Sequence, residues 1–176
     1  TDPNGNASTV VFDSLDRKLS ETDALGNTTR TSYDELGRVA SVTNAKEQTT
    51  RFTYDPLGRM TEVEDANGGT VLYAYDESGN RISMTDPNGN VTTYAYDALN
   101  RRVDETDALG NTTITTYDEV GRVVATTDAK GQISAFVYDD GNNLVQVTDA
   151  AGGIVENTHD ENGNRLTVID PNGNTT

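Results

Sequence analysis

The sequence predicts an all-β fold: tandem 21-residue β-hairpin repeats stacked into one continuous antiparallel sheet that curves or spirals. Three observations support this. A Tyr-Asp pair returns every 21 residues without insertion. Each repeat holds two runs rich in Thr, Val and Tyr, which favour strands, separated by turn segments containing Gly, Asn, Asp or Pro. No run shows the apolar spacing of an amphipathic helix.

The period divides the chain into eight copies. Phe12-Asp13 and His159-Asp160 take the two end positions of the Tyr-Asp series. We therefore treat residues 1–176 as a single array of eight repeats. The motif Thr1-Asp2-Pro3-Asn4-Gly5-Asn6 opens the chain and returns at its end from Asp170 to Asn174, so we interpret the chain as a fragment of a longer array. The repeats start near residues 12, 33, 54, 75, 96, 117, 138 and 159.

The composition limits the partners. Only 33% of residues are apolar, a fraction that suits a thin sheet better than a globule. The formal net charge of −16 repels nucleic acid and anionic membrane surfaces, so we expect neither partner. The sequence contains no cysteine and therefore no disulfide, and no apolar run is long enough to span a bilayer.

The first turn of each repeat, Tyr-Asp-x-x-Gly, predicts a left-handed backbone at its fifth position. Where Gly is absent, Asp16, Asn100 or Asn142 takes its place, and Asp and Asn tolerate a positive φ better than most residues. No ligand is needed to explain this pattern. The predicted positive-φ positions are Gly37, Gly58, Gly79, Asn100, Gly121, Asn142 and Gly163.

The second turn has the pattern Asp-x-x-Gly, as in Asp86-Pro87-Asn88-Gly89. Pro at the first central position and Gly two residues later suit a type I turn followed by a left-handed residue. Glu47 stands where most copies place Gly, so we expect a strained or differently shaped turn there.

Strand alternation places the Tyr column on one face together with residues two and four positions earlier, such as Phe52 and Thr50. We place the return-strand apolar pairs, such as Ala40/Val42 and Ile82/Met84, on the opposite face. Because the period is odd, a plain hairpin stack would move Tyr to the other face in alternate repeats. One turn of even length, or a β-bulge in each repeat, is therefore expected. The column forms a structural ladder: Tyr33, Tyr54, Tyr75, Tyr96, Tyr117 and Tyr138.

The Asp of each first turn faces an Arg four residues later across the neck of the hairpin, which predicts cross-strand ion pairs. In three repeats Asn80, Asn143 or Asn164 replaces the Arg while the Asp persists, so we expect the Asp to serve the turn first and the pair second. The predicted pairs are Asp34 and Arg38, Asp55 and Arg59, Asp97 and Arg101, and Asp118 and Arg122.

Catalysis is not expected. The single histidine, His159, sits in the Tyr column, and no nucleophile stands with a base at a recognised spacing. We expect no cofactor. The Asp-rich turns supply too few carboxylates for a typical calcium site, although calcium remains an alternative at these turns. The aromatic column suits packing between hairpins, and a glycan-binding row of rings is the alternative.

The pattern Tyr-Asp-x-x-Gly-Arg-Val, seen from Tyr33 to Val39 and from Tyr117 to Val123, resembles the RHS/YD repeat family. The resemblance covers essentially the whole chain. It implies a bacterial, secreted or cell-surface protein whose hairpins spiral into a hollow β-shell, with a C-terminal toxin enclosed in some members. Carbohydrate binding is also attributed to the family, and animal teneurins carry related repeats.

The sequence therefore favours a non-enzymatic structural scaffold, part of an extracellular shell or an extended assembly. Its expected partners are further repeats of the same or neighbouring chains, with an enclosed toxin implied by the resemblance. The alternatives are an adhesion module that recognises surface glycans through aromatic rows and, less favoured, a calcium-dependent filament.

Overall fold

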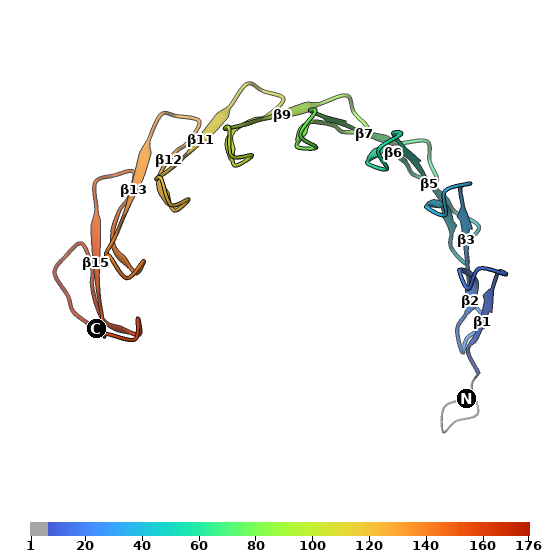
Figure 1. The fold of residues 1–176 in the computed structure, drawn as a ribbon, viewed down its shortest axis with the longest axis horizontal. Helices are drawn as coiled ribbons and strands as arrows, with labels where there is room; N and C mark the ends of the chain where they lie inside the picture. Colours follow the sequence, from blue (N-terminus) through green and yellow to red (C-terminus); the bar gives the residue numbers. More distant parts are fainter. Residues whose placement is uncertain (1–6) are drawn as a thin grey trace. The chain divides into compact units, whose positions relative to one another are not determined.

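A computed structural model describes residues 7–176 as sixteen β-strands, with no helix in that range (Figure 1). Strands adjacent in sequence are adjacent in the sheet, from β1 to β16, and the registered pairs are antiparallel. The predicted all-β class and the stacking of hairpins are therefore confirmed. The opening motif, residues 1–6, lies outside the described residues. Within residues 7–176 no helix has the length and apolar character that crossing a membrane requires.

The chain divides into two compact units, Thr1–Val91 and Thr92–Thr176. In the first unit the strands are β1 (Thr9–Phe12), β2 (Lys18–Thr22), β3 (Thr28–Tyr33), β4 (Val39–Thr43), β5 (Thr49–Tyr54), β6 (Met60–Glu64), β7 (Thr70–Tyr75) and β8 (Arg81–Thr85). The next strand, β9 (Val91–Tyr96), begins at the boundary. The second unit continues with β10 (Arg102–Thr106), β11 (Thr112–Tyr117), β12 (Val123–Thr127), β13 (Ile133–Tyr138), β14 (Leu144–Thr148), β15 (Ile154–His159) and β16 (Arg165–Ile169).

Both turns of a repeat are odd in length, and a bulge corrects the register. Residues 34–38 join β3 to β4 and residues 44–48 join β4 to β5, so each connection has five residues. Ser32 pairs with Ser41 but Tyr33 pairs with Val39, which leaves Ala40 as the extra residue of a bulge. The register shifts in the same way beside Tyr54, Tyr75, Tyr117, Tyr138 and His159. The predicted bulge is confirmed, and it keeps the Tyr column on one face.

The register corrects the predicted face of the return-strand residues. Residues directly opposite each other on paired strands share a face. Val42 pairs with Thr31 and Thr50, and Met84 pairs with Tyr73, so both lie on the Tyr face. Placing them on the opposite face was wrong, because a count through the turn misses the residue that the bulge inserts. The same correction applies to Thr126, Val147 and Val168, whose partners are Thr115, Phe136 and Asn157.

The sheet is a single layer within the described residues. The one buried hydrophobic side chain there is Tyr94, which is 9% exposed, and no described side chain is fully buried. The two faces still differ. In β5, Phe52 and Tyr54 are half-buried whereas Arg51 and Thr53 are exposed. Packing along the Tyr face between neighbouring strands therefore takes the place of a two-layer core.

The turn at Glu47 has the same shape as the other second turns. The Glu47 N–H donates to the Asn44 carbonyl at 3.0 Å, as the Gly26 N–H does to Asp23 at 3.0 Å. Glu47 reaches this geometry with a φ of +59°, in the left-handed region that a side chain adopts at a cost. The predicted strain is present, and the prediction of a different shape was wrong because the turn hydrogen bonds force the residue into the Gly conformation.

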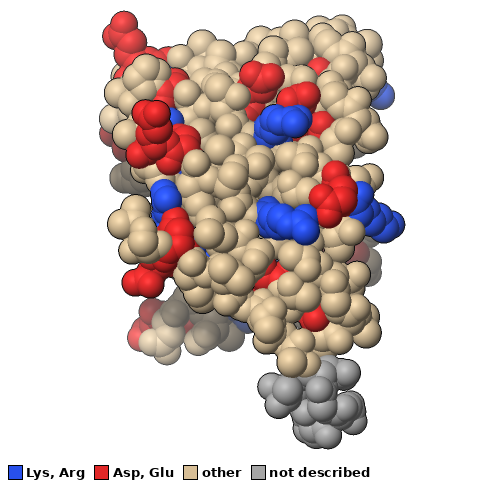
Figure 2. Space-filling model, turned by 90° about the vertical axis from the view of Figure 1, so that its right-hand side faces the viewer, with Lys and Arg blue, Asp and Glu red and all other residues tan. Residues whose placement is uncertain are grey.

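Charged side chains lie close to charges of opposite sign on the sheet surface. Figure 2 shows Lys and Arg side chains next to Asp and Glu side chains on one face. In the first unit, Arg30 and Glu47 approach to 2.8 Å, and Arg51 and Glu64 to 3.4 Å. These exposed pairs contribute little to stability, about 0–1 kcal/mol each.

Candidate functional site

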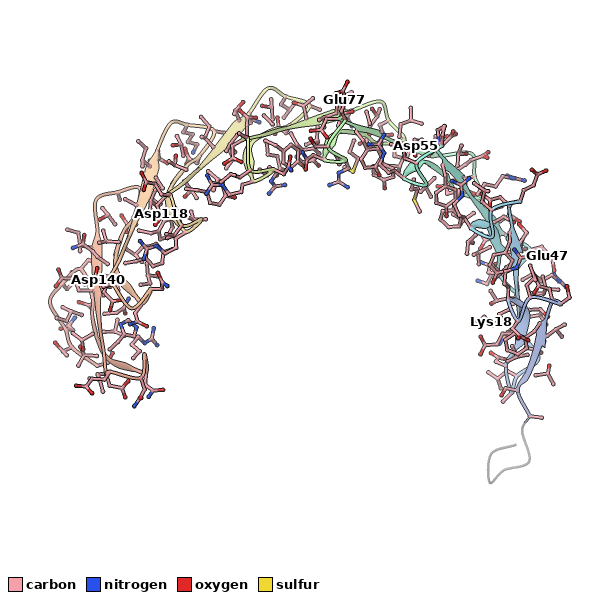
Figure 3. The ribbon with its side chains drawn as sticks, viewed as in Figure 1. Lys18, Glu47, Asp55, Glu77, Asp118 and Asp140 are labelled. Carbon is pink, nitrogen blue, oxygen red and sulfur yellow. The ribbon has the colours of Figure 1, made fainter. Side chains whose placement is uncertain are left out.

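Each first turn is organised by the carboxylate of its Asp. In the second repeat, Asp34 Oδ1 accepts the backbone N–H groups of Leu36 and Arg38, both at 2.9 Å. The Gly37 N–H donates to the Asp34 carbonyl at 3.0 Å, and the Asp34 N–H donates to the Arg38 carbonyl at 2.9 Å. Four hydrogen bonds thus close a five-residue loop, because Asp can accept N–H groups two and four residues further on. Figure 3 labels the equivalent Asp55 and Asp118.

The fifth position of every first turn is left-handed. In the second repeat a Cβ on Gly37 would lie 3.4 Å from Nη1 of Arg17, the end of a flexible side chain, so the positive φ rather than a lack of space favours Gly there. Asp16, at φ +57°, takes the same conformation in the first repeat. The φ values at the seven sequence-selected positions are +81° at Gly37, +83° at Gly58, +88° at Gly79, +59° at Asn100, +93° at Gly121, +65° at Asn142 and +80° at Gly163.

The second oxygen of the turn Asp holds the Arg across the neck of the hairpin. Arg38 Nε donates to Asp34 Oδ2 at 2.6 Å, and both side chains are about one-quarter exposed. In repeats without a neck Arg, an Asn side-chain amide donates to the same oxygen, as Asn143 Nδ2 does to Asp139 Oδ2 at 3.0 Å. These repeats lack the positive charge of the Arg, but their turns keep the same shape. The other Arg pairs are Arg17–Asp13 at 2.7 Å, Arg59–Asp55 at 2.6 Å, Arg101–Asp97 at 2.7 Å and Arg122–Asp118 at 2.6 Å.

These contacts stabilise the ionised carboxylate. Partial burial raises the pKa of Asp34, but the hydrogen bonds and the charge of Arg38 outweigh it, and the pKa lies below its ordinary value. In the second turns the Asn27 side-chain amide, followed by its backbone N–H, lowers the pKa of Asp23. Asp34 and Asp23 therefore remain ionised at neutral pH.

The same Arg reaches into the next repeat, a link that sequence reasoning missed. The Cζ atom of Arg38 lies 4.6 Å from the ring centroid of Tyr54, in cation–π geometry. Its Nη1 donates to the Asp55 carbonyl at 3.1 Å. The Tyr54 hydroxyl donates back to the Val39 carbonyl at 3.0 Å. The shared period of the Arg and Tyr columns was the signal that could have revealed this link.

The Arg–Tyr link recurs in the five repeats that carry an Arg at the hairpin neck. Five ladder Tyr hydroxyls each donate to the backbone carbonyl fifteen residues earlier, at 2.8–3.1 Å. The pairs are Tyr33 with Lys18, Tyr54 with Val39, Tyr75 with Met60, Tyr117 with Arg102 and Tyr138 with Val123. Tyr96 ends β9 and is half-buried like the others. The Cζ-to-centroid distances are 4.7 Å for Arg17 over Tyr33, 4.9 Å for Arg59 over Tyr75, 4.7 Å for Arg101 over Tyr117 and 4.9 Å for Arg122 over Tyr138.

The last junction has different chemistry. His159 takes the ladder position, and its Nδ1 is buried without a hydrogen-bond partner. Asn157 donates to the Leu144 carbonyl at 3.2 Å, the acceptor that a ladder Tyr would use. His159 thus occupies the position that a Tyr ring takes in the other repeats of the structural ladder.

The second turns are closed by amide and carboxylate groups. Asp86 Oδ1 accepts the N–H groups of Asn88 and Asn90 at 2.8 and 2.9 Å, and Oδ2 accepts the Asn90 side chain at 2.8 Å. Both oxygens are therefore already engaged within the turn. In the part of the chain that the structure describes, no group of three His, Cys, Asp or Glu residues is placed to hold a metal ion.

A similar fold occurs in known structures. A crystal structure of TcdB2-TccC3-TEV superposes with a TM-score of 0.73 at 17% identity, covering 94% of this chain and 10% of that chain. A Photorhabdus luminescens Tc holotoxin pore gives a TM-score of 0.68 at 16% identity, covering 93% and 12%. This chain therefore spans about one-tenth of the length of each of these chains. No curated protein matches it.

The sequence itself matches a family. The RHS Repeat model matches residues 33–70, 75–112 and 117–154, which together make up more than half of the chain. The matched segments begin at Tyr33, Tyr75 and Tyr117 of the structural ladder, and each spans almost two 21-residue repeats. The chain therefore belongs to the RHS repeat family, and its repeating hairpin, turn and Tyr ladder are the structure of the matched segments.

Proposed function

We propose that this chain is a non-enzymatic structural scaffold, a stretch of wall in a secreted or cell-surface β-shell or extended assembly. The observation that carries the proposal is the link made by Arg38 and Tyr54, which joins one hairpin to the next. Each repeat contacts mainly its neighbours, so the array can be extended without changing its parts. The polar groups of the turns serve this stacking.

The toxin-enclosing role is part of the proposal. Its support is the similarity in fold to a chain of the Tc holotoxin pore, which at 16% identity concerns the fold alone. A single-layer wall with half-buried side chains on one face suits an enclosure, because that face can be completed by further contents. The expected partners are further repeats and an enclosed C-terminal domain.

Electron microscopy of the purified chain over a range of concentrations tests the scaffold. We expect shells or filaments that grow with concentration, because edge strands recruit further strands. The matched control is the double variant Arg38→Ala and Arg101→Ala, which removes one repeat-to-repeat link in each unit. Particles that remain single ribbons at every concentration, in both proteins, would contradict the proposal.

The ring geometry bears on the glycan-binding alternative. Tyr94 is 9% exposed, and five of the six ladder rings carry an Arg guanidinium over one face. Stacking of a sugar needs an open ring face, so this geometry favours packing. A glycan array decides the point, since tight retention of one glycan by the native chain would favour adhesion.

The calcium alternative has its own test. The second-turn carboxylates are engaged by Asn amides and backbone N–H groups, so binding of calcium would have to displace these contacts. We expect the melting temperature to be the same with calcium and with a chelator. A chelator-dependent loss of several degrees would support the calcium-dependent filament instead.

A further inference from the structure

Three first turns of the first unit present an exposed leucine at the same position. Leu15, Leu36 and Leu57 follow the turn Asp by two residues and are 70%, 73% and 75% exposed. We call these three residues the Leu row. A leucine that is about three-quarters exposed contributes little to the fold, and three in register form a recurring apolar feature that a partner could cover.

The Leu row is held in register by the links between repeats. Arg17 lies over Tyr33, and Arg38 lies over Tyr54 and donates to the Asp55 carbonyl. Leucine and arginine also occur together. Leu or Val stands at this position in the five repeats with a neck Arg, whereas Ser78, Gly141 and Asn162 take it in the three with Asn. A stiff row loses little freedom on binding, which favours recognition.

The spacing of the Leu row matches one face of an α-helix. Each repeat adds two strands, so successive leucines lie about 9–10 Å apart along the sheet. Residues seven apart on a helix lie about 10.5 Å apart on nearly the same face. Three successive heptad positions therefore reach three successive first turns.

Backbone hydrogen bonding disfavours a β-strand as the partner at these turns. The N–H groups of Leu36, Gly37 and Arg38 are all used inside the turn. The carbonyl groups of a docked β-strand would find no free N–H donor among these three groups. An α-helix satisfies its own backbone and needs only apolar contact.

The charges beside the Leu row indicate the sign of the partner. The turn Asp and neck Arg neutralise each other in the three repeats that carry the Leu row. This leaves the carboxylates of Asp16 and Glu35 without an ion-pair partner in the described part of the chain, and they lie beside Leu15 and Leu36 in sequence. Glu77 and Asp140, labelled in Figure 3, are further acidic residues of first turns. A second copy would bring like charges together, whereas a basic flank would be attracted.

We propose that the Leu row is a docking surface for a cationic amphipathic helix with apolar residues at heptad spacing. The three leucines pack against the apolar face of the helix, and lysine or arginine residues on the flanks of the helix lie opposite Asp16 and Glu35. Because raised salt screens these exposed charges, it weakens the complex without abolishing the apolar contact. Leu36 and Leu57 lie in turns away from the edge strand β1, whereas Leu15 lies in the turn that follows it.

A fluorescence anisotropy titration tests the proposal with the whole chain. The probe is a labelled three-heptad peptide with leucine at one position of each heptad and lysine on both flanks. A second peptide of the same composition has the leucines moved off one face. The test variant carries Leu15→Ser, Leu36→Ser and Leu57→Ser, and serine is the native residue at this position in the fourth repeat. The control variant carries Leu25→Ser and Leu109→Ser, which remove the exposed leucines of second turns.

We expect the heptad peptide to bind the native chain and the control variant alike, and the test variant at least about tenfold more weakly. A circular dichroism melt shows that the test variant is folded. Equal binding to the native chain and the test variant would overturn the proposal, as would equal binding of the two peptides. Absence of binding of the heptad peptide to the native chain would also overturn the proposal. In that case, self-association of the native chain that is lost in the test variant would identify a second copy as the occupant.

Discussion

The guanidinium of Arg38 lies over the ring of Tyr54, with its Cζ 4.6 Å from the ring centroid, while its Nε holds Asp34 of its own hairpin at 2.6 Å. One side chain thus stabilises the turn of its own repeat and contacts the ladder Tyr of the next repeat. Since the described sheet has a single layer, such contacts between neighbours stand in for a core. The stability of the array is then a sum of repeat and junction contributions.

Asp118 and Arg122 are expected to differ in their effect on stability. Asp118→Ala removes the acceptor of two backbone N–H groups and the ion pair, whereas Arg122→Ala leaves the turn closed by Asp118. Asp118→Ala should lower the melting temperature by several degrees, about twice the loss seen for Arg122→Ala. Thermal melts followed by circular dichroism measure both. Equal losses would show that the Asp does not serve the turn first.

Tyr54→Phe isolates the hydroxyl of a ladder ring. The ring and its contact with Arg38 remain, but the hydrogen bond to the Val39 carbonyl is lost. We expect a loss of about 0.5–1.5 kcal/mol in the free energy of unfolding. Tyr54→Ala, which also removes the ring, should cost clearly more. Urea denaturation measures both, and a Phe variant as stable as the native protein would place the stabilisation in the ring alone.

Glu47→Gly is expected to stabilise the protein. Glu47 has a φ of +59°, and Gly relieves the left-handed strain at the cost of a freer unfolded chain. The exposed pair with Arg30 contributes little, so the net gain is about 0.5 kcal/mol. The reverse change, Gly26→Glu, meets no atom within 4 Å and should destabilise through backbone strain alone. Denaturation midpoints that move the other way would argue against strain at this turn.

Acid should destabilise the array below about pH 4. The folded-state pKa of Asp23 is lowered, first by the Asn27 side chain, so its contribution is present above its unfolded pKa of about 3.9 and is lost as the pH falls through the lower folded value. We expect melting temperatures that change little from about pH 7 to 5 and then fall. Asp23→Asn, which copies the native turn at Asn44, should reduce the acid sensitivity. Melting temperatures that keep rising to about pH 2.5 would be incompatible with these lowered pKa values.

The sequence alone determined the features that are local in the chain. The 21-residue period, the strands and the left-handed first-turn positions follow from residue type and spacing, because φ preference and side-chain alternation act over a few residues. The odd period required either a turn of even length or a bulge, and the structure shows the bulge. The family match then confirmed the resemblance drawn from Tyr33 to Val39 and from Tyr117 to Val123.

Only the tertiary structure decided which groups from different repeats meet. Arg38 reaches Tyr54 and Asp55 across a strand interface, and Val42 joins the Tyr face because the bulge changes the count. Leu36, in the turn between β3 and β4, is 73% exposed. These outcomes depend on the register between strands and on the conformation of long side chains that cross from one strand to the next. The spacing of residues in the sequence specifies neither.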